Sequence, residues 1–323
     1  MINEIDNDVP DNMLRIEYML GNFCNYKCHY CFPGSNEGDV LWPDIEVVKK
    51  NLYHLLTHYK KYGKNKFHFY LVGGEPTVWK DLPELCNFLK SNFDVIIELS
   101  TNASRSLRWW VKNLKNFDHI AISVHNEFAK IDHIIDVADM LYQNGAYVNA
   151  DVLMDPNNFN ACKGIVNELF NSQHNWPIIA KAVYFDGVHK HTQDQLDYLS
   201  EPIKRMPSME WHNSITKKPI VTTTIKYNNG NVVNTIDDGW IKKNNLNFFY
   251  NWSCNIGVEI IKIFGNGRIS SNCQQPLFGL NTEYNLYDSN FIETFDVPIV
   301  PTICKQLICP CNRETVAKKI KHA

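Results

Sequence analysis

Short apolar stretches alternate with segments of helical periodicity through the first 186 residues. The stretches predicted as strands are 14–20, 66–72, 94–100, 118–124, 146–154 and 177–185. The segments predicted as helices are 44–63, 81–92, 105–117, 127–145 and 160–172. Such alternation gives parallel strands joined by right-handed crossovers, and nearly continuous apolar strands are typical of a sheet covered on both faces. We therefore predict an α/β fold over residues 14–186, either an open sheet or a partial barrel.

The pattern changes after residue 186. Residues 187–244 are predicted as a linker with a short helix around 194–205 and a hairpin at 219–236. Residues 245–323 are predicted as a small β-rich domain around a second hairpin at 258–273, and they end in a short basic helix or tail. Residues 1–13 are predicted as a polar segment that precedes the first strand.

Composition argues against several classes of protein. The 323 residues are 44% hydrophobic and carry a formal net charge of −3. The chain has no excess of basic residues that would indicate binding to nucleic acid. No apolar run approaches the roughly 18 residues that a membrane helix needs. The acidic, polar first residues are unlike a signal peptide. We therefore expect a cytoplasmic protein that keeps its thiols reduced and binds neither nucleic acid nor membrane.

The ten cysteines form two clusters. The first cluster, in the loop after the first predicted strand, is Cys24, Cys28 and Cys31. The second cluster is Cys254, Cys273, Cys304, Cys309 and Cys311. The remaining two, Cys86 and Cys162, are predicted as buried apolar residues. In a reducing compartment such clustering favours metal or iron–sulfur ligation over disulfides.

Three thiolates in one loop suggest an iron–sulfur cluster with an open position. A four-iron cluster usually takes four cysteine ligands, so three leave one iron open to a substrate or cofactor. The alternative is a zinc loop completed by His29 or by a distant residue. The sequence Gly-Gly-Glu-Pro at 73–76 follows the second predicted strand. Because the carboxyl ends of parallel strands open onto one face, we expect both motifs to meet at one site.

These two motifs resemble those of the radical S-adenosylmethionine (radical SAM) family. The resemblance is carried by Cys-Asn-Tyr-Lys-Cys-His-Tyr-Cys at 24–31 and by Gly-Gly-Glu-Pro at 73–76. It implies a partial (β/α)6 TIM-like barrel over residues 14–186. It also implies a [4Fe-4S] cluster on Cys24, Cys28 and Cys31, whose open iron binds the amino and carboxylate groups of S-adenosylmethionine.

The resemblance implies further cofactor contacts. Gly73, Gly74 and Glu75 would meet the methionine amino group, and Tyr30 would lie near the adenine. The implied cofactor-binding residues are Tyr30, Gly73, Gly74, Glu75, Pro76, Ser100, Thr101, Asn102, Ser123 and His125. His125 departs from the family pattern, and it touches either cofactor or substrate or is a hydrogen-bonded loop histidine.

Three further residues are candidates for substrate binding. Asn149, Asp151 and Tyr184 lie on the fifth and sixth predicted strands, where the barrel interpretation points them at a substrate. Ordinary packing of barrel side chains explains each of them equally well.

The second cysteine cluster resembles the twitch and SPASM extensions of radical SAM enzymes. The resemblance rests on the spacing Cys254-x10-Gly265-x7-Cys273. It implies one auxiliary [4Fe-4S] cluster that uses four of the five late cysteines. The alternative is a structural zinc ribbon, because zinc and iron–sulfur sites share ligand types.

The resemblance implies an enzyme, an oxidoreductase that reductively cleaves S-adenosylmethionine. The resulting 5′-deoxyadenosyl radical abstracts hydrogen from an unactivated carbon of a small molecule, with a net oxidation. Because the core begins near residue 14, we expect no separate peptide-binding domain before it. The expected electron donor is flavodoxin or ferredoxin. One alternative is a maturase of ribosomal peptides, and another is a non-catalytic zinc or iron–sulfur metalloprotein.

Overall fold

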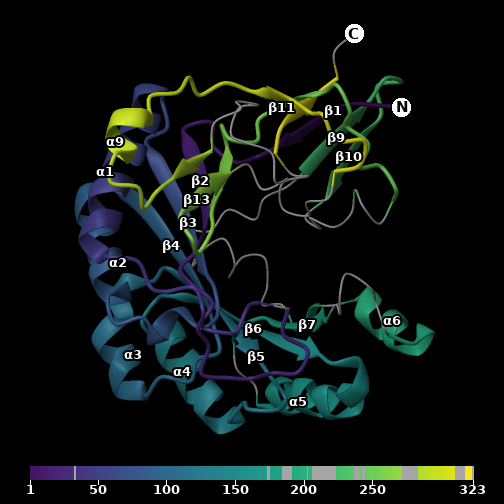
Figure 1. The fold of residues 1–323 in the computed structure, drawn as a ribbon. Helices are drawn as coiled ribbons and strands as arrows, with labels where there is room; N and C mark the ends of the chain where they lie inside the picture. Colours follow the sequence, from purple (N-terminus) through teal and green to yellow (C-terminus); the bar gives the residue numbers. More distant parts are fainter. Residues whose placement is uncertain are drawn as a thin grey trace.

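A computed structural model describes most of the chain. The described residues are 1–32, 34–172, 175–183, 191–201, 203–205, 223–235, 241, 244–270, 283–309 and 317–321. They form two sheets, one of ten strands and one of six. Five of the helices lie together along the outer side of the larger sheet (Figure 1).

The ten-stranded sheet has the order β14-β13-β12-β2-β3-β4-β5-β6-β7-β8. Its central strands are β2 (Met13–Met19), β3 (Lys66–Val72), β4 (Asp94–Thr101), β5 (His119–Val124), β6 (Tyr147–Met154) and β7 (Ile178–Ala182). Each of these pairs in parallel with the next. All six predicted strands are present in the predicted order, so the prediction of an α/β fold with a parallel sheet is confirmed.

Helices between these strands cover one face of the sheet. They are α1 (Ile45–Lys61), α2 (Leu82–Asn92), α3 (Leu107–Asn113), α4 (Ile131–Gln143) and α5 (Phe159–Asn171). Side chains alternate between the faces of a strand. In β3, Phe67 and Phe69 belong to the core packed beneath the helices, whereas His68 and Tyr70 are only half-buried and face the other way. The inner face is therefore more polar than the sequence pattern indicated.

Short elements complete this part of the chain. They are the 3-10 turns η1 (Pro76–Val78), η2 (Leu114–Asn116) and η3 (Pro156–Asn158), and the helices α6 (Gln193–Ser200) and α9 (Phe291–Thr294). The remaining strands of the larger sheet are β8 (Ile203–Arg205), β12 (Ile260–Ile263), β13 (Arg268–Ser270) and β14 (Tyr284–Asn285), of which β8 and β14 form its two edges.

The six-stranded sheet joins segments from both ends of the chain (Figure 1). Its strands, in spatial order, are β10 (Val232–Thr235), β9 (Thr223–Tyr227), β1 (Ile2–Asn7), β16 (Lys319–Ile320), β11 (Ser253–Cys254) and β15 (Thr302–Ile303). Two predictions were wrong here. Residues 1–13 are not merely a polar segment, because β1 pairs with β9 and β16. The expected basic helix or tail at the end is also wrong for the described residues 317–321, because Lys319 lies in strand β16 and is 2% exposed.

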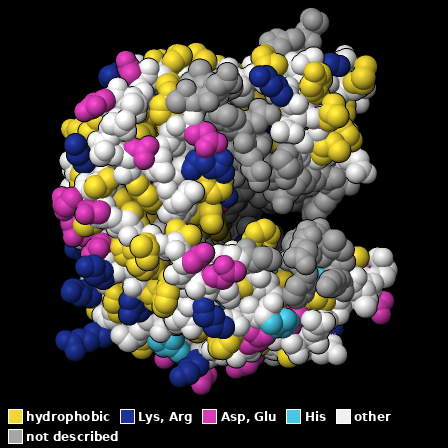
Figure 2. Space-filling model, viewed as in Figure 1, with side chains coloured by type: hydrophobic (Ala, Val, Ile, Leu, Met, Phe, Trp, Pro, Cys, Tyr) yellow, Lys and Arg dark blue, Asp and Glu magenta, His cyan; other side chains and the backbone are white. Residues whose placement is uncertain are grey.

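The second predicted hairpin belongs to the larger sheet. Ile260 and Ile263 of β12 pair in parallel with Arg15 and Tyr18 of β2. A boundary at residue 245 therefore cuts across both sheets, since β11 joins one sheet and β12 the other. Pairing between segments so far apart leaves no local signal in the sequence, which is why the predicted domain boundaries differ from the sheets observed. Figure 2 shows acidic and basic side chains of both signs scattered over the side of the molecule that carries the helices α1 to α4.

Among the helices of the described ranges, none combines the length and the apolar character that a membrane crossing requires.

The Ile5→Ala substitution tests the second sheet. Ile5 is fully buried and packs with Ile225 and Trp252. Truncating a buried isoleucine to alanine costs about 2–5 kcal/mol. We expect a lower urea midpoint for loss of the tryptophan fluorescence signal.

The matched control is Glu4→Ala on the same strand. Its partner is Lys226, at 2.7 Å, and exposed ion pairs contribute about 0–1 kcal/mol. Equal midpoints for the two variants would contradict the placement of β1 in this sheet.

Candidate cofactor site

The loop between β2 and α1 is fixed by hydrogen bonds to the segment that follows β3. Leu20 N–H donates to the Val72 carbonyl at 2.9 Å. Beyond the strands, Gly74 N–H donates to Gly21 O at 3.0 Å and Glu75 N–H donates to Phe23 O at 2.8 Å. The β2–β3 pairing thus continues into both loops. It fixes the backbone at Phe23, the residue directly before the first cysteine, Cys24.

Gly73 and Gly74 permit this approach because neither carries a side chain. A Cβ on Gly74 would lie 2.2 Å from Phe23 O, and one on Gly73 would lie 2.5 Å from Gly21 O. Gly73 also has φ of +147°, a value that L-residues rarely adopt. The family resemblance predicts that these glycines contact a ligand, the methionine amino group of S-adenosylmethionine. The structure shows that they first allow close approach by the cysteine loop.

Glu75 presents a buried carboxylate in a ring of donors. Its Oε1 accepts from Thr77 Oγ1 and Thr101 Oγ1, both at 2.6 Å, and its Oε2 accepts from Asn102 N–H at 2.6 Å. Burial raises the pKa of Glu75, and these hydrogen bonds act in the opposite direction because they favour the charged form. The donors fix the carboxylate at the ends of β3 and β4.

The three loop thiols lie in partly buried, polar surroundings. Cys24 Sγ accepts from Tyr26 N–H at 3.3 Å, and Asn102 Nδ2 lies 3.9 Å from it. Cys28 Sγ lies 3.3 Å from His125 Nδ1. Burial raises the pKa of all three thiols, that of Cys28 to about 12. A bound metal ion would reverse this shift, since the thiolate is the ligand.

His29 is engaged elsewhere. Its Nδ1 contacts Glu127, its backbone N–H donates to Glu127 Oε2 at 3.2 Å, and its Nε2 lies 3.6 Å from Asp155 Oδ2. The ring is thus held between two carboxylates. In this conformation it does not complete a zinc site with the loop thiols.

One cavity of about 170 Å³ brings the predicted motifs together. Its lining residues are Cys24, Tyr26, Cys28, Cys31, Ser35, Asn36, Gly73, Gly74, Glu75, Ser100, Thr101, Asn102, Ser123 and His125. The cysteine loop, the Gly-Gly-Glu segment and the ends of β4 and β5 therefore share one space. The expectation that the two motifs converge is met by the geometry.

Two predicted cofactor residues do not line this cavity. Pro76 is buried at the start of η1. Tyr30 is also buried, its OH lies 3.1 Å from His125 Nδ1, and the two rings stack at 5.8 Å. Tyr26 lines the cavity instead and stacks on Phe128 at 5.0 Å. Sequence analysis missed Tyr26, although it lies between two cysteines of the motif.

His125 is a neutral imidazole at physiological pH. Burial lowers its pKa to about 4, while Glu127 acts weakly the other way. It contacts a loop thiol and the Tyr30 hydroxyl, so both interpretations offered for it hold in part: it is a hydrogen-bonded loop histidine and it lines the cavity.

Two of the three candidate substrate residues lie beside the cavity. Asn149 Nδ2 donates to Asp151 Oδ1 at 2.7 Å, and Lys181 Nζ donates to Asp151 Oδ2 at 2.5 Å. Asp151 is directly opposite Ser123 in the β5–β6 ladder, and Ser123 lines the cavity. Lys181 was not predicted as a site residue, because no recognisable motif surrounds this lysine in the sequence. Tyr184 lies outside the described residues.

Three of the late cysteines come together on the second sheet. Cys254 is in β11, and Cys304 N–H donates to the Trp252 carbonyl at 2.8 Å, which continues the β11–β15 pairing. Burial raises the pKa of Cys254, and the neighbouring Cys309 and Cys304 raise it further. Cys309 packs with Cys304 in one apolar cluster. The other two late cysteines, at 273 and 311, lie outside the described residues.

The remaining described cysteines follow the prediction. Cys86 and Cys162 are fully buried within the main core. All eight described cysteines are free thiols.

The spacing of donor atoms bears on the zinc alternative. With Zn–S bonds of about 2.3 Å, sulfurs around one tetrahedral zinc lie about 4 Å apart. Among the described residues, one group of three or more His, Cys, Asp or Glu has its ligand atoms within 4.8 Å of one another, and it contains no cysteine. Among the described cysteines, neither the three thiols of the first cluster nor the three described thiols of the second (Cys254, Cys304 and Cys309) are thus all as close together as one zinc ion requires.

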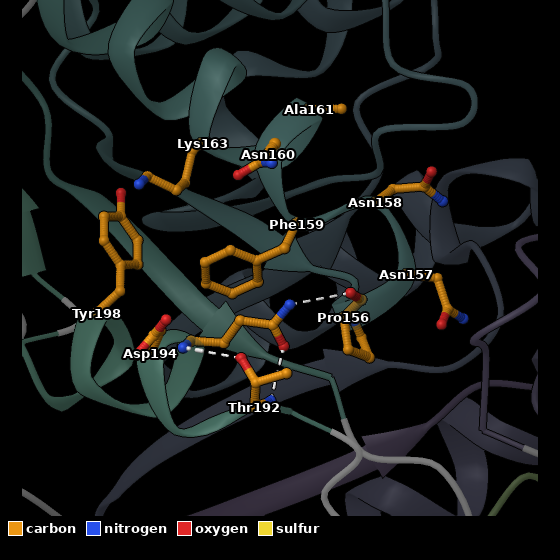
Figure 3. Close-up of a pocket in the computed structure, with 11 residues that line it drawn as sticks. Pro156, Asn157, Asn158, Phe159, Asn160, Ala161, Lys163, Thr192, Asp194 and Tyr198 are labelled. Atoms are coloured by element: carbon orange, nitrogen blue, oxygen red, sulfur yellow. Dashed lines mark hydrogen bonds between the residues drawn. The ribbon is translucent and has the colours of Figure 1, made fainter.

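A second cavity, of about 600 Å³, lies where α5 begins beside α6 (Figure 3). Phe159 and Tyr198, which line it, pack edge to face with ring centroids 5.6 Å apart, and Lys163 Nζ lies 5.1 Å from the centroid of the Tyr198 ring. Gln195 Nε2 donates to the Pro156 carbonyl at 3.1 Å, and Thr192 caps α6. These side chains mainly bind one another, and none of the described residues that line this cavity is a cysteine.

Part of the first half of the chain is similar to known proteins. The model of the Radical SAM superfamily matches residues 18–137. An S-adenosylmethionine-dependent nucleotide dehydratase of Thermoplasmatales archaeon (strain ISO4-H5) is 25% identical over 142 residues, 40% of this chain and 48% of the relative. A mitochondrial GTP 3′,8-cyclase of Arabidopsis thaliana is 39% identical over 95 residues, 27% of this chain and 23% of the relative. The chain spans less than half the length of these curated relatives.

Solved structures share the fold. The AdoMet-bound structure of anSMEcpe has a TM-score of 0.51 and 13% identity, covering 87% of this chain and 80% of that one. The structure of Streptococcus suis SuiB bound to S-adenosylmethionine has a TM-score of 0.50 and 14% identity, covering 88% and 65%. These likenesses support an α/β TIM-like fold.

The Gly74→Ala substitution tests the backbone clamp on the cysteine loop. A methyl group 2.2 Å from the Phe23 carbonyl forces the loop to move, at a cost of about 1–3 kcal/mol. We expect several-fold less iron and sulfide per chain after anaerobic reconstitution.

The matched control is Gly164→Ala in α5, where an added Cβ meets nothing within 4 Å. This variant should load like the unmodified protein. Full loading of the Gly74 variant would show that the clamp does not position the thiols.

Proposed function

We propose that this chain, whose residues 18–137 match the model of the Radical SAM superfamily, is an enzyme that uses S-adenosylmethionine for radical chemistry on a small molecule. The observation that carries the proposal is the single cavity shared by the three loop thiols, the Gly-Gly-Glu segment and the ends of β4 and β5. A non-catalytic metal site needs no such open space beside its ligands.

The residues present fit an iron–sulfur cluster with an open position. Cys24, Cys28 and Cys31 supply three soft sulfur donors to the cavity, and among the described residues neither a fourth cysteine nor His29 lines it. Cysteine thiolates are the usual ligands of such clusters. When bound with S-adenosylmethionine, a [4Fe-4S] cluster supplies a 5′-deoxyadenosyl radical that removes a hydrogen atom from an unactivated carbon.

The chain's own residues bind and orient. Glu75 offers a carboxylate whose position is fixed by three neighbouring donors, and carboxylates bind ammonium groups such as that of methionine. Ser100 and Asn102 present polar groups at the end of β4. Tyr26 lines the cavity and stacks on Phe128, so an aromatic ring of fixed orientation forms part of its wall.

Asn149, Asp151 and Lys181 are the proposed contacts to substrate. They form a hydrogen-bonded row on β6 and β7, adjacent to Ser123 at the edge of the cavity. A mixed row of amide, carboxylate and ammonium suits a polar molecule with hydroxyl or anionic groups. This favours a small, polar substrate, and a net oxidation of an alcohol is the reaction we propose.

The curated relatives are consistent with a small polar substrate, since their names refer to a nucleotide dehydratase and a GTP cyclase. A peptide substrate is the second candidate, because anSMEcpe, which shares the fold, has also been solved with a peptide bound.

We also propose an auxiliary [4Fe-4S] cluster on the second sheet. Cys254, Cys304 and Cys309 are near enough to influence one another, and a fourth ligand would come from Cys273 or Cys311. Such a cluster would accept an electron from a substrate radical, whereas flavodoxin or ferredoxin would be the external donor that reduces the cluster on Cys24, Cys28 and Cys31. In this proposal the late cysteines belong to a twitch-like unit.

The first experiment is anaerobic reconstitution followed by an assay for 5′-deoxyadenosine with added reductant. We expect about eight irons per chain, as two four-iron clusters require, and formation of 5′-deoxyadenosine. Replacing Cys24, Cys28 and Cys31 together by Ala should abolish the product and remove about half of the iron.

The matched control replaces Cys86 and Cys162, which are buried in the core, by Ser. It should keep the iron content, although its stability falls. Product formation by the triple variant would overturn the proposed function. Activity with only about four irons per chain would keep the radical chemistry and remove the auxiliary cluster.

The Lys181→Met substitution tests the substrate row. It removes the ammonium group that binds Asp151, so a polar substrate should bind more weakly. We expect unchanged 5′-deoxyadenosine formation without substrate and a several-fold higher KM once a substrate alcohol is supplied. Lys163→Met, which alters a lysine outside the thiol cavity, is the control and should leave KM unchanged. Equal KM values for both variants would contradict the role of Lys181.

A further inference from the structure

Three metal-ligating side chains converge on the inner face of the larger sheet, away from both cysteine clusters. They are His68 of β3, Glu98 of β4 and His119 of β5, and one ligand atom from each lies within 4.8 Å of the other two. His68 Nε2 lies 3.0 Å from Glu98 Oε2. The two imidazole rings lie 6.0 Å apart at 74° to each other.

The sheet itself fixes this arrangement. The three residues come from consecutive parallel strands, and Glu98 is directly opposite His119 in the β4–β5 ladder. His68 is opposite Ile96, which places it diagonally from Glu98 on the same face. Side chains held by neighbouring strands lose little freedom on binding a ligand, so the group is preorganised.

Burial makes the composition of the group informative. Glu98 is 3% exposed and His119 is 2% exposed. A carboxylate at such depth is costly unless it is paired or coordinates a metal. Two imidazoles and one carboxylate are the ligand set of many zinc sites and of non-haem iron(II) sites.

We propose that His68, Glu98 and His119 bind one divalent transition-metal ion, Zn²⁺ or Fe²⁺. Three protein ligands leave at least one coordination position for water or another small ligand. The ion would cross-link three strands of the sheet and offset the charge of the buried carboxylate. This inference stands on these three side chains alone and does not rest on the proposed radical reaction.

The site lies on the same face as the thiol cavity but nearer the amino ends of the strands. Glu98 precedes Ser100, a lining residue of that cavity, by two positions, which is roughly 7 Å along a strand. A cavity of about 330 Å³ opens where β5 begins, and His119 is among its lining residues.

The alternative is a metal-free hydrogen-bonded network of the same three side chains. Both arrangements hold the carboxylate between two imidazoles, so only metal binding separates them. The measurement must also distinguish this site from partly loaded cysteine sites, which bind zinc through sulfur.

The experiment uses Zn²⁺ alone as the probe on the anaerobically reconstituted full chain. The protein is treated with a mild chelator, equilibrated with zinc and desalted, and the zinc content is measured by mass spectrometry. Absorption spectroscopy at the zinc edge then reports the ligand shell. We expect about one zinc ion per chain, bound by nitrogen and oxygen at about 2.0–2.2 Å.

Glu98→Gln and, separately, His68→Gln should lose this zinc. His68 is the more exposed of the two, which gives a second variant if the first folds poorly. The control is His58→Gln, another buried histidine, whose Nε2 bonds the Val297 carbonyl at 2.7 Å. It should retain the zinc.

Loss in both variants with retention in the control supports the site. Equal zinc in the variants and the unmodified protein overturns it, as does a first shell of sulfur at about 2.3 Å. Absence of zinc from the unmodified protein overturns it as well.

Discussion

The site depends on one backbone contact, the continuation of the β2–β3 pairing into the two loops that follow. Gly74 and Glu75 donate to the carbonyls of Gly21 and Phe23, and two glycines make room for that approach. Without it, the cysteine loop would be an irregular excursion between a strand and a helix. With this contact, Cys24 directly follows a residue whose carbonyl is hydrogen-bonded, so the backbone on this side of the cavity is fixed.

The same contact places Glu75 at the centre of the site. Its carboxylate binds donors from the next strand and its own turn, so the ends of β3 and β4 and the cysteine loop form one unit. A polar group fixed by its neighbours in a low-dielectric setting interacts strongly with a ligand and costs little to reorganise. This is the physical basis on which the cavity can bind a charged cofactor.

The inner face of the sheet is divided along the strands. Near their carboxyl ends lie the thiols and the polar ends of β4 and β5, with the Asp151–Lys181 pair beside them. His68, Glu98 and His119 lie nearer the amino ends of the strands, and they belong to no recognised sequence motif. Helices cover the opposite face, where Phe67 and its neighbours provide the core. Stability is thus concentrated on one face of the sheet and candidate chemistry on the other.

The sequence by itself determined the order of strands and helices in the first half of the chain, because apolar periodicity is a local property. It also determined the two motifs and the face on which they meet, since parallel strands align their carboxyl ends. The role of Gly74 toward the cysteine loop, and the choice of Tyr26 over Tyr30 for the cavity, were decided by contacts between residues distant in sequence. So were the strands at the two ends of the chain. Ile5 and Lys319 lie in short polar segments, and they become buried only because partners far along the chain supply the other side of each ladder. Such pairings depend on tertiary packing, which no local pattern of residues encodes.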